Sequence, residues 1–159
     1  MTTAADPMTL RHGPSWANRL ALAPQTNVQS HADGTLSDQE LEWLVARGRG
    51  GFGLTMTCAA YVAPAGQAWA GQLGIAGDEH LPGLTRLAAG LRATGTRTAV
   101  QLHHGGVRAD ADVTGLPLQC PWAPTGTETP AMSLAEIDQA VADFSAAAAR
   151  AEQAGFDGV

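Results

Sequence analysis

The segment Gln101–Gly106 (QLHHGG) places an amide, two imidazoles and two glycines side by side. An amide donates and accepts hydrogen bonds at once, so Gln101 could read the polar edge of a heterocycle. It could equally bond only to neighbouring backbone, and the residue type alone leaves both roles open. The two histidines could bind a metal. Adjacent strand residues point to opposite faces, however, and no carboxylate cluster accompanies the pair, so metal binding is less favoured.

Two other short segments suit a flat ligand. Ala23–Thr26 (APQT) contains a proline that fixes the path of the chain and a Thr26 hydroxyl that can donate a hydrogen bond. Cys58–Ala60 has small side chains that leave room for a planar group, and Cys58 is more typical of a small buried residue than of a nucleophile. The glycine-rich run Gly48–Gly53 precedes a strand rather than a helix, so we do not expect it to cradle phosphate.

Strand and helix patterns alternate along the chain and predict the elements that position these segments. Apolar runs at 20–23, 52–57, 97–102 and 156–159 are typical of buried strands. Helices are expected from 37 to 50, from about 78 to 94 and from 133 to 155. Two of them open on predicted capping boxes, Ser37 with Glu40 and Ser133 with Glu136.

Apolar stripes at helical spacing predict which helix faces meet the core. The second helix carries one stripe and the third helix another, and the members are Leu81, Leu84, Leu87, Ala88 and Leu91, and then Ile137, Val141, Phe144 and Ala148.

The strand–helix alternation predicts an α/β fold with parallel strands and right-handed crossovers. Long loops at 58–77 and 103–132 follow strands, so they should gather at the carboxyl ends of the strands, where α/β proteins place their ligand sites. A strand ending at Val159 would have no loop beyond it, and a closed eight-stranded barrel needs roughly 250 residues. We therefore expect either a small open sheet or the front part of a longer fold.

The composition bounds the class of protein. The 159 residues are 45% hydrophobic and 15% charged, which predicts one globular domain, with an irregular lead-in over residues 1–19. A net charge of −6, with nine arginines and no lysine, argues against a nucleic-acid or membrane-surface binder. Cys58 and Cys120 are far apart and read as reduced thiols. The chain shows neither a membrane-spanning run nor a signal peptide, and we expect a cytoplasmic protein.

The ordered set of motifs resembles the Old Yellow Enzyme family, the FMN-dependent NAD(P)H:flavin oxidoreductases. Each motif is weak alone, but their order and spacing agree over nearly the whole chain, which is most similar to the shorter, bacterial branch. The matching pieces are Asn18–Pro24, Asp33-Gly34, Arg47–Leu54, Val62–Gly66, Leu73–Ile75, Asp78–His80, Gln101–Gly106 and Ala151–Val159.

The resemblance implies a (β/α)8 TIM barrel with FMN across its carboxyl-terminal mouth. Residues 1–159 would form the N-terminal part of that FMN-binding domain, with about four parallel strands and three helices. NAD(P)H would reduce the flavin, which would pass hydride to an activated alkene. By position, Ala23, Pro24, Gln25 and Thr26 would border the flavin, with Thr26 tuning its potential. Ala59 would contact the pyrimidine side, and Gln101 would hydrogen-bond to the pyrimidine edge.

The chain also departs from the family pattern. Val107 stands where an arginine is usual, with Arg108 next, and Val28 stands where an aromatic residue often lines the substrate side. The family's substrate-anchoring His pair, proton-donating Tyr, basic residue near flavin N1 and phosphate site would all lie beyond Val159. We therefore expect a fragment that binds free FMN weakly or not at all, and that is unstable, aggregates, self-associates to finish a barrel or pairs with a missing C-terminal half.

Two alternatives remain at this point. The chain could be a catalytically inactive remnant or assembly partner that lacks the substrate and phosphate sites. More remotely, it could be a small α/β metal-binding domain that uses His103 and His104.

Overall fold

The fold is built on a parallel sheet, seen in a computed structural model that describes all 159 residues. The strands are β1 (Ala21–Leu22), β2 (Leu54–Tyr61) and β3 (Arg97–His103), in the order β1-β2-β3. Beyond β3 the Val100 N–H donates to the Gly158 carbonyl at 3.1 Å, which begins a fourth parallel position. Three of the four predicted strands are therefore confirmed, whereas the fourth, expected at 156–159, forms only an isolated parallel bridge between Ala99 and Gly158.

Strand β2 is longer than its sequence pattern indicated. We predicted that it ends at Thr57 and that Cys58–Ala60 lies in the following loop, and this is wrong, because β2 continues to Tyr61. Alanine is a weak strand former, so the local pattern fades there. Pairing with β3, which extends to Tyr61 opposite His103, keeps the segment extended.

Three long helices cover the sheet, and their bounds agree with the predicted ranges. They are α1 (Asp38–Arg49), α2 (Leu81–Arg92) and α4 (Leu134–Ala154). Short helices are η1 (Pro64–Gly66), η2 (Asp78–His80), η3 (Gly106–Arg108) and α3 (Ala111–Thr114). No helix combines the length and the apolar character needed to cross a membrane.

The two predicted capping boxes have different outcomes. At α4 the box is complete, since the Ser133 hydroxyl accepts from the Glu136 N–H and the Glu136 carboxylate accepts from the Ser133 N–H. At α1 only half of it forms. The Ser37 hydroxyl accepts from the Glu40 N–H at 3.1 Å, but the Glu40 carboxyl turns inward and accepts from the Ser30 hydroxyl instead.

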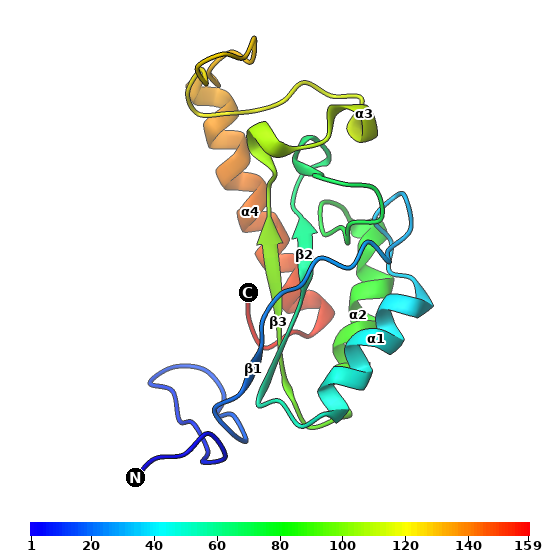
Figure 1. Cartoon of the computed structure of the whole chain (residues 1–159), viewed down its shortest axis with the longest axis vertical. Coiled ribbons are helices and arrows are strands. Elements are labelled where there is room, and N and C mark those ends of the chain that lie inside the picture. The colour runs from blue at the N-terminus through cyan, green and yellow to red at the C-terminus, as the bar shows by residue number, and fades with distance from the viewer.

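The loops that follow β2 and β3 lie at one end of the sheet, and the N-terminus lies toward the other (Figure 1). Residues 1–19 contain no helix or strand beyond one antiparallel bridge between Met8 and Trp16. They contact the start of the strands, where the Asn18 side chain accepts from the Gly53 N–H at 2.9 Å. The carboxyl ends of the strands are thus left to the long loops, as the loop lengths predicted.

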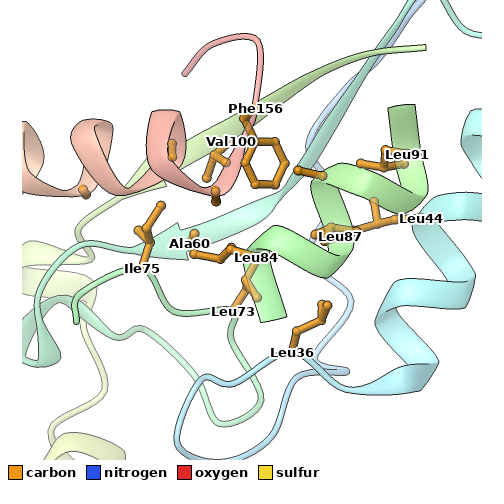
Figure 2. Packing of buried hydrophobic residues seen from close by; sticks show 14 of the residues in the cluster. Leu36, Leu44, Ala60, Leu73, Ile75, Leu84, Leu87, Leu91, Val100 and Phe156 are labelled. Carbon is orange, nitrogen blue, oxygen red and sulfur yellow. The ribbon is translucent and has the colours of Figure 1, made fainter. Parts of the chain in front are cut away.

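The core lies between the sheet and the helices, with α2 at its centre (Figure 2). The predicted α2 stripe is confirmed, since Leu84, Leu87, Ala88 and Leu91 are fully buried and Leu81 is partly buried. Full burial of one leucine contributes about 1.5–3 kcal/mol. The stripe belongs to one hydrophobic cluster, which also includes Leu44 of α1, Ala60 of β2, Val100 of β3 and Phe156.

Helix α4 meets the core with a different face from the one we predicted. The expected stripe of Ile137, Val141, Phe144 and Ala148 is not buried, and the Val141 side chain is 63% exposed. The buried face is instead made of Ala147, Ala151 and Ala154. Small side chains let α4 approach α2 and β3 closely, which leaves the larger apolar residues facing outward.

Candidate functional site

The candidate ligand site begins with a pair of residues that face each other across β2 and β3. Ala59 and Gln101 are register partners. A bulge between Met56 and Ala59 gives β2 one extra residue there, and the Thr57 hydroxyl accepts from the Gln101 N–H at 3.3 Å. Bulges re-aim side chains and are common beside active sites. Here the bulge sets which β2 residue lies opposite Gln101.

The Gln101 side chain is exposed, and its amide has no partner within the protein. Its neighbours Val100 and Leu102 pack against the helix layer, so Gln101 lies on the other face of β3. Ala59 is 6% exposed and has only a methyl group to present. A planar group could therefore approach the pair closely and take up both hydrogen-bonding functions of the amide.

The segment Ala23–Thr26 follows β1 directly and so lies at the same end of the neighbouring strand. Ala23, Gln25 and Thr26 are exposed and Pro24 is partly buried. No hydrogen bond within the protein engages the Thr26 hydroxyl. The structure thus places all six predicted site residues at the carboxyl ends of three adjacent parallel strands.

The backbone is strained just after this segment. Val28 has a φ of 49°, in the left-handed region that a β-branched residue rarely adopts. The Asn27 side chain supports the turn by accepting from the Gln29 N–H at 3.2 Å. Such strain persists only where surrounding contacts hold it.

Buried contacts supply that support. The Ser30 hydroxyl donates to the Glu40 carboxyl, and the Ser30 N–H donates to the Gly71 carbonyl at 3.1 Å. Farther along the loop, the Asp33 carbonyl accepts from the Tyr61 hydroxyl at 2.9 Å and contacts His80 Nε2 at 3.2 Å. Burial, followed by the charges of Asp33 and Glu79, raises the pKa of Tyr61 to about 12, so Tyr61 remains a neutral donor.

Cys58 lies beside Ala59 but is not built for nucleophilic chemistry. Its side chain is 3% exposed. Burial, and then the nearby Glu40 carboxylate, raise the pKa of the thiol strongly, which leaves it protonated at neutral pH. The prediction of a small buried residue is confirmed.

The two histidines differ in their surroundings. His104 Nδ1 accepts from the Gly106 N–H at 3.0 Å, and its Nε2 lies 3.1 Å from the side-chain oxygen Oε1 of Gln119. His103 instead contacts the Gln72 amide at 3.1 Å and lies against the Trp69 ring. The structure brings together no group of three or more His, Cys, Asp or Glu side chains that could hold a metal ion.

Gln72 is a site residue that the sequence analysis missed. It lies in a loop of alanine and glycine with no periodicity. Its side-chain oxygen accepts from the nearby Ala68 N–H, but its amide nitrogen contacts Ala59 and His103, which are 13 and 31 residues away in the chain. Only the meeting of β2, β3 and this loop shows what it does, so no local signal could have found it.

The surface has two grooves that lie away from the six predicted flavin-border residues. One of about 830 Å³ runs between α1 and α2 and is lined by residues such as Leu41, Trp43 and Arg86. Another of about 510 Å³ lies beside α4 and is lined by Ile137, Val141 and His104 among others. Neither is lined by Ala23–Thr26, Ala59 or Gln101.

The comparisons with known proteins agree with this arrangement. Residues 6–159 match the model of the NADH:flavin oxidoreductase / NADH oxidase family. The chain belongs to this family. Its relatives include the probable NADH-dependent flavin oxidoreductase YqiG of Bacillus subtilis, which is 36% identical over 97% of this chain and 42% of its own length. A NADPH dehydrogenase of Bacillus pumilus is 35% identical over 98% of this chain and 46% of its own length.

Solved structures of the same family have a similar fold. The Old Yellow Enzyme homologue of Zymomonas mobilis matches 99% of this chain at a TM-score of 0.88 and 26% identity. The match covers 47% of that chain, so this chain spans about half the length of the relatives it matches. The predicted fold class is confirmed: the chain is part of an α/β TIM barrel of the Old Yellow Enzyme type. The family's cofactors are FMN and NAD(P)H.

Proposed function

We propose that this chain supplies the flavin-ring border of an FMN-dependent NAD(P)H oxidoreductase that reduces activated alkenes by hydride transfer. One observation supports this most strongly: the free Gln101 amide lies opposite the small Ala59, at the strand ends where Thr26 follows β1. These are the residues that the family motifs assign to the flavin. The names of the relatives, a flavin oxidoreductase and a NADPH dehydrogenase, support the same class of reaction.

The residues present fit a flavin ring. The Gln101 amide has no internal partner, so it is free to donate to and accept from the polar edge of the pyrimidine. Ala59 would allow the ring to approach the strand, and Ala23–Thr26 would border it through backbone and the Thr26 hydroxyl. When bound, FMN supplies the hydride chemistry, while the protein orients it and tunes its electronics.

The remaining groups of such a site would come from residues outside this chain. The chain spans less than half of each relative described above. By the family resemblance, the phosphate site and the substrate-anchoring and proton-donating side chains belong to the other part of the barrel. The proposed role of these 159 residues is therefore to bind and orient the ring.

The proposal is tested by titrating the purified protein with FMN and following the quenching of flavin fluorescence. We expect Gln101→Leu to weaken binding about 10-fold, since a buried polar edge loses its hydrogen bonds. The matched control is Gln153→Leu on the exposed surface of α4, which should bind FMN as the unmodified protein does. Equal affinity of Gln101→Leu and the unmodified protein for FMN would contradict the proposal.

A further inference from the structure

Gly71, in the loop after β2, lies against the strained turn at Val28. Gly71 is buried and has a φ of 74°, and a Cβ added to it would lie 2.7 Å from the Val28 carbonyl oxygen and 3.2 Å from the Ser30 carbonyl oxygen. The Ser30 N–H donates to the Gly71 carbonyl at 3.1 Å. Only a residue without a side chain lets the two backbone segments approach this closely.

Glu40 holds the same turn from the side of helix α1. It is the third residue of α1 after the N-cap Ser37, the position from which Glu136 of α4 completes its capping box. The Glu40 carboxyl does not bond to the Ser37 N–H and accepts from the buried Ser30 hydroxyl instead. A hydrogen bond that would cap the helix is thus replaced by one to the turn.

Both contacts continue to Ala59 on β2. Gln72, the residue after Gly71, donates from its amide nitrogen to the Ala59 carbonyl at 3.2 Å. On the other side, burial and then the nearby charge of Glu40 raise the pKa of the thiol of Cys58, the residue before Ala59. All five residues are buried within this chain, so these contacts are complete within it.

The segment Ala23–Thr26 depends on this turn for its place. No hydrogen bond within the protein engages any of its four residues. The segment continues β1 at its start, and Val28 follows Thr26 by two residues at its end. Within this chain, the place of the Thr26 hydroxyl relative to Ala59 is therefore set by β1 and by the turn.

We propose that Glu40 and Gly71 are positioning residues that hold the turn at Val28 and thereby set the distance between Thr26 and Ala59. The inference rests on the proposed function, because Thr26 and Ala59 are the residues that would border the flavin ring. Glu40 and Gly71 would act through the turn without touching the ring. A border that is held in place before the ring arrives lowers the ordering cost of binding.

The role of Gly71 is tested by comparing Gly71→Ala with the matched control Gly95→Ala. Gly95 has a similar φ of 89°, but it is exposed, and a Cβ added there would meet nothing within 4 Å. Both variants carry the cost of an alanine at positive φ, whereas only Gly71→Ala displaces the turn.

The readout is the backbone NMR spectrum of each purified protein without FMN. We expect only Gly71→Ala to shift the amide signals of Thr26 and Ala59. It should also speed hydrogen exchange at the Ser30 amide about 10-fold, because the bond to residue 71 is weakened. Unmoved Thr26 and Ala59 signals in Gly71→Ala, or equal movement in Gly95→Ala, would overturn the proposal.

Two substitutions test Glu40 in the same spectra. Glu40→Met fills a similar volume but cannot accept from the Ser30 hydroxyl, so it should shift the signals of Thr26 and Ala59. Glu40→Gln keeps an acceptor oxygen and should restore most of the original signal positions. Shifts confined to α1 in Glu40→Met, or no recovery in Glu40→Gln, would overturn the role of Glu40.

The proposed function is tested separately by adding FMN to the unmodified protein. FMN that shifts amides elsewhere, but not those of Thr26 and Ala59, would contradict the proposed function. That result would not change how the turn is held, which the spectra without FMN decide.

Discussion

Ser30 and Glu40 form a polar pair in the interior just behind the strained turn at Val28. Glu40 is fully buried, and one of its carboxyl oxygens accepts from Ser30 while the other has no partner. Because one oxygen of this buried carboxyl already lacks a hydrogen bond, losing the bond from Ser30 would be costly. The pair ties the loop after β1 to helix α1, and so holds the segment that carries Thr26.

The consequence is a prediction for Ser30→Ala, which leaves neither oxygen of the Glu40 carboxyl hydrogen-bonded. We expect a loss of about 1–3 kcal/mol in the free energy of unfolding, measured by urea denaturation. Replacing both partners, in Ser30→Ala with Glu40→Met, should cost less than the single change, because no buried polar group is then left unpaired. Unchanged stability in Ser30→Ala would show that the pair does not anchor the loop.

His103 makes the stability depend on pH. Burial, and then His104, hold its folded pKa below the ordinary value of 6.5, so the unfolded chain takes up this proton first as the pH falls. Its contribution to stability is complete above that value and is lost as the pH falls through the lower, folded pKa. Urea denaturation at about pH 7.5 and about pH 5 measures how much the free energy of unfolding falls between the two. The fall should be smaller in His103→Gln than in the unmodified protein. Equal losses would contradict this account.

The sequence predicted the residues of the proposed site better than the residues that hold them in place. Gln101, Ala59 and Thr26 lie in motifs of fixed spacing, and the structure brings all three to one end of the sheet. The sequence did not predict the roles of Glu40 and Gln72. The Glu40 carboxyl could serve either its own helix end or the interior, and the choice depends on Ser30, ten residues earlier. Gln72 has one local contact, with the Ala68 N–H, but its partners on β2 and β3 are far from it in the chain.

At the scale of elements, α4 shows what a hydrophobic pattern can and cannot predict. Its existence and its cap followed from the capping box and the helix-forming alanines. Its orientation did not, because the helix is apolar over a wide arc and α2 admits only the face of small residues. Strand β2 shows the complementary case, since pairing with β3 extended it through alanines that a local pattern does not favour.

The orientation of α4 can be tested by introducing leucine on its buried face and, separately, on its exposed face. Ala147→Leu forces extra methyl groups into the contact with α2 and should lower the free energy of unfolding by about 1–3 kcal/mol. Val141→Leu, on the exposed face, should change it by less than about 0.5 kcal/mol. Urea denaturation of the two variants decides the matter, and a neutral Ala147→Leu would mean that α4 is not seated on its alanine face.

For the whole molecule, the decisive fact is that this chain corresponds to less than half of each relative compared above. The sheet has three parallel strands and one isolated bridge beside β3, and the outward face of α4 keeps Val141 and Phe144 exposed. In a barrel the neighbouring strands and helices cover such surfaces. The chain's own contribution is the ring border at β1–β3, on which the proposed function depends.

Mapping backbone amide shifts by NMR during an FMN titration tests most directly where the flavin binds. We predict shifts concentrated at Ala23, Gln25, Thr26, Ala59 and Gln101. The amides that line the groove between α1 and α2, such as those of Leu41 and Trp43, should not move. Shifts concentrated in that groove, with none at the ends of β1–β3, would contradict the account.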